Sequence, residues 1–160
     1  MIEIITTGGT IDKVYYDNKN DYQVGDPFIV DLLKKMNFSV DYSVKSLMRI
    51  DSLDMTIKDR NQIYEHIKNL TTEKILITHG TDTIIDTALF LKKIKNKTIV
   101  LTGSLKPALF IDNDATFNIG CALTAVQTLE KGIYIVMNGR IFNPEKVTKN
   151  IEKNIFESKD

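Results

Sequence analysis

The sequence predicts an α/β fold: a doubly wound, mainly parallel, flavodoxin-like sheet with helices on both faces. Short and almost wholly apolar runs recur along the chain, as expected of parallel strands that are covered on both sides. Segments with helical spacing lie between these runs, so that strand and helix alternate throughout. Two of the apolar runs are followed by turns rich in glycine and hydroxyl side chains.

Each expected element has its own local signal. Asp26 before Pro27 predicts a helix start, with an N-cap followed by proline at the first helical position. Thr56 and Asp59 resemble a capping box at the second helix, and Gly132 is expected to end the fourth helix as a left-handed cap. The expected strands cover residues 2–5, 39–50, 74–78, 98–101 and 133–138, and the expected helices cover residues 27–36, 56–70, 82–93 and 113–129.

The expected strand order brings polar residues to one crevice. A flavodoxin-like sheet has the order 2-1-3-4-5, which places the first and third strands side by side, and ligands bind beyond the carboxyl ends where the order reverses. Thr10 follows the first strand, Asp51 and Ser52 follow the second, and Thr81 and Asp82 follow the third. We therefore expect these side chains to meet at one site.

Residues 12–25 interrupt the alternation of strand and helix. The segment is polar, contains three tyrosines and has no helical period. Loops of this length are usually functional lids or disordered. The tail, residues 151–160, is also polar, with only Ile155 and Phe156 available to anchor it.

The totals exclude several classes of protein. A chain of 160 residues with 42% apolar residues is best explained by one globular domain. Lys and Arg (21) balance Asp and Glu (21), which argues against a nucleic-acid binder. The single cysteine, Cys121, cannot form an intrachain disulfide and is expected in the core. The chain shows no signal peptide and no membrane-spanning run, so a soluble, cytoplasmic protein is expected.

Thr10 is the first candidate for chemistry. Gly8 and Gly9 before it allow backbone angles closed to other residues and let a substrate approach the chain closely. Backbone N–H groups at such a turn can stabilise an oxyanion, and the hydroxyl could act as a nucleophile if a base lies nearby. The alternative is a phosphate-binding turn, which the sequence favours less because neither glycine-rich phosphate motif is present.

Thr81 and Asp82 form the second candidate. Thr81 could be a second nucleophile or a proton relay, and Asp82 could anchor an ammonium group. The alternative is that Thr81 caps the next helix and that Asp82 favours its positive end. His79 has no evident carboxylate partner in the sequence and is expected to be structural. Lys149, taken alone, is an ordinary surface lysine, and no spacing suggests a metal site.

Taken together, these motifs resemble the bacterial-type asparaginase/glutaminase family. The resemblance covers nearly the whole chain, and the motifs occur in family order with family-like spacing. Its main carriers are TGGTI at residues 7–11 and THGTDT at 78–83, supported by YQVG at 22–25, DSLDM at 51–55, LTGS at 101–104, NDA at 113–115 and VTK at 147–149.

The resemblance implies hydrolysis of a side-chain amide through an acyl-enzyme, with release of ammonia and no cofactor. Thr10 would be the primary nucleophile, and Tyr22 on the lid would bond to it and help to handle its proton. Thr81, Asp82 and Lys149 would form a second polar group that passes protons and positions water. A charged lysine cannot be the first base, although it could orient Thr81 or donate a proton to the leaving amine.

The resemblance also implies how an amino acid would be held. Ser52 would bind its α-carboxylate and Asp82 its α-ammonium, and Gly9 and Gly80 complete the expected substrate-binding set. Leu53 stands where many relatives have a polar residue, and its side chain cannot accept a bond from the ammonium. We therefore expect a high KM more than a lost reaction.

Family members usually carry a second, smaller α/β domain. The chain stops near residues 156–158, about where the linker to that domain would begin, so residues 1–160 are expected to be a single domain of the N-terminal type. The leading hypothesis is an L-asparaginase that forms a homo-oligomer. Two alternatives stay open: a non-catalytic module that binds amino acids or amides, and an amidase subunit that acts on another amide with a partner.

Overall fold

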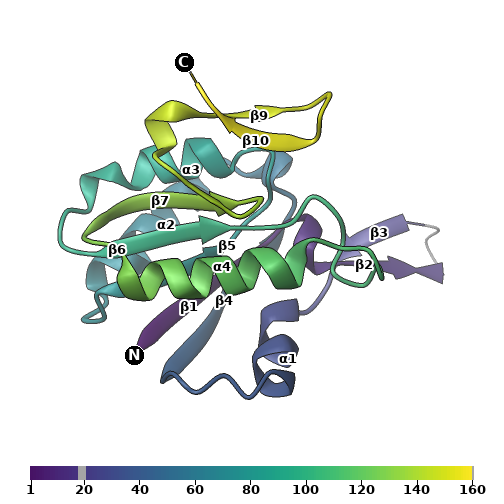
Figure 1. Ribbon diagram of the computed structural model, residues 1–160, viewed down its shortest axis with the longest axis horizontal. Helices are drawn as coiled ribbons and strands as arrows, with labels where there is room; N and C mark the ends of the chain where they lie inside the picture. Colours follow the sequence, from purple (N-terminus) through teal and green to yellow (C-terminus); the bar gives the residue numbers. More distant parts are fainter. Residues whose placement is uncertain (18–20, 160) are drawn as a thin grey trace.

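A parallel sheet forms the centre of the molecule, with helices on both faces (Figure 1). The computed structural model describes residues 1–17 and 21–159. The six strands of the central sheet follow the order β4-β1-β5-β6-β7-β8, and within this sheet only β7 and β8 pair antiparallel. The first five of these along the chain thus have the order 2-1-3-4-5, which confirms the predicted topology. The strands are β1 (Ile2–Gly8), β4 (Tyr42–Ile50), β5 (Lys74–Thr78), β6 (Thr98–Thr102), β7 (Gly132–Met137) and β8 (Arg140–Phe142).

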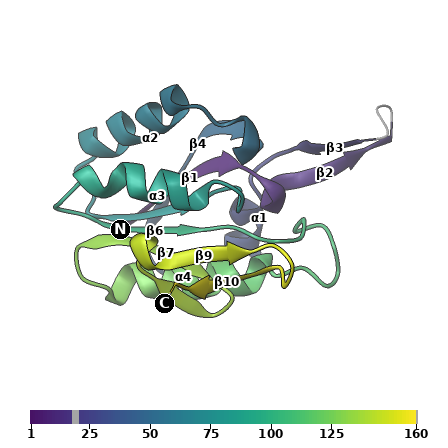
Figure 2. The ribbon, with the colours of Figure 1, turned by 90° about the horizontal axis from the view of Figure 1, so that it is seen from above.

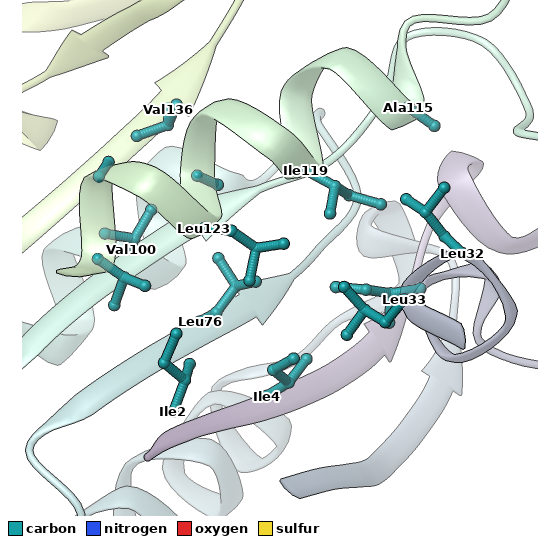
Figure 3. Close-up of a cluster of buried hydrophobic side chains, with 14 of the residues drawn as sticks. Ile2, Ile4, Leu32, Leu33, Leu76, Val100, Ala115, Ile119, Leu123 and Val136 are labelled. Carbon is teal, nitrogen blue, oxygen red and sulfur yellow. The ribbon is translucent and has the colours of Figure 1, made fainter. Parts of the chain in front are cut away.

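Helices cover both faces of the sheet (Figure 2). On one face lie α1 (Phe28–Lys35) and α4 (Ala115–Thr128), and on the other lie α2 (Ile57–Asn69) and α3 (Ile84–Phe90). Alternation along the strands divides the apolar side chains between two cores, because neighbouring residues of a strand point to opposite faces. Figure 3 shows the core under α1 and α4, where helix residues pack on strand residues such as Ile4, Leu76 and Val100.

The predicted capping box at α2 is confirmed, and the predicted cap at α1 is wrong. Thr56 Oγ1 accepts from the Asp59 N–H, and the Asp59 carboxylate accepts from the Thr56 N–H at 2.8 Å. At α1, the Asp26 carboxylate instead pairs with Arg49 at 2.8 Å. The buried Asp12 carboxylate replaces it, accepting from the Phe28 N–H at 2.8 Å.

Gly132 does not cap α4 in a left-handed conformation. The chain leaves α4 through Leu129, whose backbone is already extended (φ −73°, ψ 149°), so no left-handed residue is needed. Gly132 is the first residue of β7 and pairs with Thr98.

The described part of residues 12–25 forms strands, although the sequence predicts a lid or loop without regular structure. Strands β2 (Lys13–Tyr16) and β3 (Asp21–Val24) form an antiparallel hairpin with Lys13 opposite Val24. This hairpin projects from the body of the molecule (Figure 2). Cross-strand pairing holds the two strands together without a core of their own. Such a hairpin shows no helical or apolar period, so the periodicity of the sequence does not reveal it. Residues 18–20 of the predicted lid lie outside the described residues.

The polar tail also forms a hairpin. Strand β9 (Val147–Asn150) pairs antiparallel with β10 (Ile155–Ser158). The side chain of Phe156, on β10, is buried. The predicted anchoring role of Phe156 is therefore confirmed, whereas residue 160 lies outside the described part. Within residues 1–17 and 21–159, no helix is both long enough and apolar enough to cross a bilayer.

Candidate active site

Three turns at the carboxyl ends of β1, β4 and β5 touch one another. Gly9 has a φ of 87°, and a Cβ atom placed on it would lie 2.4 Å from the Gly80 Cα atom. A Cβ atom on Gly80 would in turn lie 2.5 Å from the Ser52 Oγ atom. Only glycine permits backbones to approach so closely. The predicted convergence of the three strand ends is therefore what the chain adopts, with Thr10 and Thr81 each directly following one of these glycines.

Lys149 reaches this junction from β9. Its ammonium group donates to Thr81 Oγ1 at 3.0 Å and lies 2.6 Å from Asp82 Oδ1. Thr81 is buried, whereas Asp82 is exposed at the surface. Because Thr81 Oγ1 accepts from Lys149, its own proton remains available for a substrate or a water molecule. The alternative in which Thr81 caps α3 is wrong, since α3 begins after Thr83 without a side-chain cap.

Ser52 is buried on a 3₁₀ turn, Ser52–Asp54, that follows β4. Its Oγ atom accepts from the Thr83 N–H at 3.4 Å, and its carbonyl accepts from the Thr83 hydroxyl at 2.8 Å. These bonds fix the turn against the start of α3. Thr83 was not singled out from the sequence, where it looks like one more helix-flanking threonine.

Asp51 holds two groups at once. One carboxylate oxygen accepts from the Leu53 N–H at 3.1 Å, and the other pairs with Lys13 at 2.6 Å. Burial raises the pKa of the Asp51 carboxyl. The hydrogen bonds from Lys13 and Leu53 and the charges of Lys13 and Lys149 outweigh that effect, so the pKa lies below its usual value. Asp51 is therefore an anion at neutral pH.

Thr10 opens a 3₁₀ turn, Thr10–Asp12, and is half-buried. Tyr22 lies on β3, where its ring packs against those of Tyr15 and Phe110 with centroid separations of 5.3 and 6.1 Å. Among the residues that the structure describes, no hydrogen bond joins the Tyr22 hydroxyl to Thr10. The expected contact between the two side chains thus stays a prediction.

His79 belongs to a buried structural network. Its Nδ1 atom lies 2.8 Å from the Gly80 carbonyl, which can only accept, so Nδ1 carries the proton. Its Nε2 atom then accepts a hydrogen bond from the Thr87 hydroxyl at 2.9 Å. The Thr87 oxygen in turn accepts from the Arg60 Nε–H at 3.1 Å. Burial lowers the pKa of His79 to about 4, although the Gly80 hydrogen bond raises it and the Arg60 charge lowers it further. His79 is therefore neutral and fixes the turn before Thr81, as expected of a structural residue.

Two cavities lie at different distances from the candidate site, one beside it and one away from it. A polar cavity of about 470 Å³ lies between the hairpin and the end of β4, lined by residues that include Tyr22, Arg49 and Asp51. A more apolar groove of about 520 Å³ runs along α4 and shares no residue with the junction of the three turns. In the described ranges, 1–17 and 21–159, no group of three His, Cys, Asp or Glu residues could hold a metal ion.

A doubly wound α/β domain with threonine-bearing turns at two neighbouring strand ends is the class of protein that this geometry defines. The chain belongs to the asparaginase family: residues 1–158 match its N-terminal domain, described as "Asparaginase, N-terminal". This agrees with the resemblance carried by the sequence motifs.

Individual relatives agree with the family. The chain is 29% identical to a glutaminase-asparaginase of Acinetobacter glutaminasificans, over 94% of this chain and 50% of that protein. The solved structure of the thermostable L-asparaginase from Thermococcus kodakarensis matches with a TM-score of 0.83 and 25% identity, over 98% of this chain and 50% of that one. A glutamyl-tRNA(Gln) amidotransferase subunit of Methanococcus vannielii is 32% identical over 88% of this chain and 34% of that protein. The chain thus spans half or less of the length of these relatives.

Proposed function

We propose that this chain hydrolyses the side-chain amide of L-asparagine to aspartate and ammonia through a threonine acyl-enzyme. One observation carries the proposal: Lys149 binds Thr81 and Asp82 beside the contact between Gly9 and Gly80. Two alcohols, Thr10 and Thr81, and a charged pair thus adjoin one junction of strand ends, which supports the proposal. Membership of the asparaginase family supports the same reaction.

In the proposed reaction, the Thr10 hydroxyl attacks the amide carbon while its proton passes by way of Tyr22 to the polar group formed by Thr81, Asp82 and Lys149. The carbonyl oxygen becomes an oxyanion, for which the backbone N–H groups of Thr10 and Thr81 are the proposed donors. Loss of one such donor typically costs about 2.7–4 kcal/mol of transition-state stabilisation. Collapse of the intermediate breaks the C–N bond and releases ammonia. Water then attacks the Thr10 ester and frees aspartate.

The charged groups have distinct proposed roles. Lys149 carries a charged ammonium group beside Asp82, so it does not act as the first base. Its proposed roles are to orient the Thr81 hydroxyl and to supply a proton to the leaving amine. Thr81 passes protons and positions the water. Tyr22 closes over Thr10 from the hairpin and helps to accept its proton.

The zwitterionic end of the substrate needs a partner for each charge. We propose that Ser52 binds the α-carboxylate and Asp82 the α-ammonium, with Gly9 and Gly80 leaving room for the substrate against the backbone. L-glutamine hydrolysis is expected to be weaker than that of L-asparagine.

The direct test is ammonia release from L-asparagine by the purified chain, with Thr10→Ala and Thr81→Ala as variants. We expect both substitutions to lower kcat by about 100-fold or more, since each removes a positioned group from the reacting centre. Turnover that survives Thr10→Ala unchanged would refute the nucleophile. Calorimetry with L-aspartate, read beside the ammonia assay, separates the enzyme from a binding module, because the module would bind L-aspartate tightly but release no ammonia from L-asparagine.

A second candidate function has its own support. Because the chain is 32% identical to an amidotransferase subunit, it could release ammonia for a partner protein or act on an amide that a partner presents. Co-purification of a stoichiometric second polypeptide, with little turnover of free asparagine by the isolated chain, would favour this function over the first.

We also infer self-association through α4. Its fourteen residues, Ala115–Thr128, include no charged side chain, and its groove is lined by Phe117, Cys121, Val136 and Ile141 among others. Uncharged grooves of this kind commonly mark interaction surfaces. A strict monomer in size-exclusion chromatography at high concentration would contradict this inference. The expected cytoplasmic location remains a prediction for cell fractionation.

A further inference from the structure

We propose that Asp51 is a positioning residue whose two carboxylate oxygens hold the base of the β2–β3 hairpin against the turn that carries Ser52. The proposal rests on the proposed function, because it assigns Asp51 a role in bringing the nucleophile and the substrate-binding turn to a fixed separation. The family resemblance gave Asp51 no such role, and the sequence alone did not point to Lys13.

The first arm of this arrangement is the Ser52 turn. Asp51 is the N-cap of the 3₁₀ turn Ser52–Asp54, and its Oδ1 atom accepts from the Leu53 N–H at 3.1 Å. The Asp51 carbonyl also accepts from the Asp54 N–H at 3.0 Å. Displacement of Asp51 would therefore displace the backbone of Ser52, which is buried against Gly80.

The second arm is the hairpin. The Asp51 Oδ2 atom lies 2.6 Å from the Lys13 ammonium. Lys13 directly follows the turn Thr10–Asp12 and pairs with Val24 across the base of the hairpin, two residues from Tyr22. A shift of Lys13 would therefore move both the turn that carries Thr10 and the strand that carries Tyr22.

The opposite side of the hairpin base is already fixed to α1. Gly25 N–H donates to the Asp12 carbonyl at 2.8 Å, and the Asp12 carboxylate accepts from the Phe28 N–H at 2.8 Å. The Lys13–Asp51 pair adds a tie on the β4 side, so the base is held from two directions. The hairpin beyond this base projects from the body (Figure 2), and its position depends on how the base is held.

The Lys13–Asp51 pair should affect the position of the hairpin more than the free energy of unfolding. Both side chains are partly exposed, at 27% each, so solvent screens the pair and its contribution should lie near the upper end of the ~0–1 kcal/mol typical of exposed pairs. A weak tie at the base of a projecting element changes where that element lies without deciding whether the protein folds. The variants below should therefore remain folded.

The test compares variants that separate the two oxygens. Asp51→Asn keeps an acceptor for the Leu53 N–H but removes the ion pair, and Lys13→Met removes the same pair from the other side. We expect each to raise the KM for L-asparagine and the Kd for L-aspartate about 3- to 10-fold, with a smaller change in kcat, because substrate binding requires both arms in register. Lys13→Arg preserves the pair and should behave like the unmodified protein.

The double variant, Lys13→Met with Asp51→Asn, tests the coupling. If the two residues act as one pair, the Kd of the double variant should be no higher than the higher Kd of the two single variants. If they act independently, the fold-increases of the two single variants should multiply. Lys131→Met is the matched control, because it breaks a pair with Glu73 (3.2 Å) at the amino ends of the strands, away from the site. It should leave KM and Kd unchanged.

Hydrogen exchange supplies a readout that does not depend on activity. Amides of β2 and β3 should exchange several-fold faster in Lys13→Met and in Asp51→Asn than in the unmodified protein or in Lys131→Met, while amides of β5 stay protected. If the protein neither binds L-aspartate nor releases ammonia, the proposed function fails, and exchange still decides whether the pair holds the hairpin. Normal turnover with unchanged KM, Kd and exchange in both variants would overturn the role of Asp51 and leave the proposed function intact.

Discussion

Lys149 donates a hydrogen bond to the Thr81 hydroxyl over 3.0 Å, although 68 residues separate the two along the chain. The contact depends on the β9–β10 hairpin, which lies outside the six-stranded sheet (Figure 1). Phe156 on β10 is buried in the core under α2 and α3, and it pairs with Lys149 across the hairpin. A buried aromatic side chain therefore sets the position of a polar group in the candidate site.

Replacement of Lys149 by methionine should lower kcat by about 100-fold or more, because the Thr81 hydroxyl loses its donor and the leaving amine loses its proton source. KM should rise less than kcat falls. The measurement is steady-state ammonia release from L-asparagine. Lys146→Met is the control, since Lys146 is an exposed lysine of the preceding turn, and it should retain full activity. A Lys149→Met protein that keeps more than half of its kcat would remove Lys149 from the mechanism.

Alanine at Gly9 or at Gly80 should destabilise the protein by at least about 1–3 kcal/mol, the usual cost of overpacking. The added methyl group would lie 2.4 Å from the backbone of Gly80 in the first case and 2.5 Å from Ser52 in the second. Gly120→Ala is the matched control: it lies within α4, where an added Cβ meets nothing within 4 Å. Helix propensity predicts that it stabilises by up to about 1 kcal/mol. Urea unfolding of the three variants gives the comparison, and equal midpoints would contradict the close approach of the turns.

The sheet and the meeting of its strand ends could be predicted from sequence because apolar runs, helical spacing and chain order fix them. Contacts that depend on side-chain direction could not be predicted. Asp26 has the right residue type and position to cap α1, yet Asp12 performs that role from a turn fourteen residues earlier in the sequence. Nothing in the local sequence indicates that Asp12 is buried or that Lys13 faces Asp51, because both follow from the hairpin's pairing and its seating on β4.

Asp12→Asn should become increasingly stabilising as the pH rises from about 4 to about 7. Burial raises the pKa of Asp12 from 3.8 to about 7, against the Phe28 hydrogen bond and the Arg49 charge, which lower it, while the Asp26 charge raises it slightly. The folded state thus holds the proton more tightly than the unfolded state, so this contribution is complete below pH 3.8 and is lost as the pH passes 7. The loss amounts to about 4 kcal/mol at most. Asparagine does not titrate, and a difference in unfolding free energy that stays constant from pH 4 to 8 would contradict the burial of a protonated carboxyl.

His79→Gln should remove a pH dependence of the opposite sign. The folded pKa of about 4 lies below the ordinary value of 6.5. The unfolded chain therefore takes up a proton first, and the unfolding free energy falls as the pH drops from about 6.5 to about 4. A shift of this size corresponds to about 3 kcal/mol. The difference between the unmodified protein and His79→Gln, measured by urea unfolding at several pH values, isolates this slope from that of Asp12. A slope unchanged by the substitution would show that His79 is not the buried neutral imidazole of the network.

Leu53→Gln tests whether substrate anchoring limits this protein. Leu53 is 71% exposed beside the buried Ser52, and its backbone N–H donates to Asp51. Its side chain therefore has no structural role to lose, while a glutamine oxygen could accept a bond from the substrate ammonium. A hydrogen bond to a charged group that forms equally in the bound and transition states lowers KM and leaves kcat alone, here by about 3- to 10-fold. Leu53→Met is the matched control, since it keeps an apolar side chain of similar size. If the glutamine and methionine variants have the same KM for L-asparagine, the α-ammonium does not lie beside residue 53, and the proposed orientation of the amino acid between Ser52 and Asp82 must be reversed or abandoned.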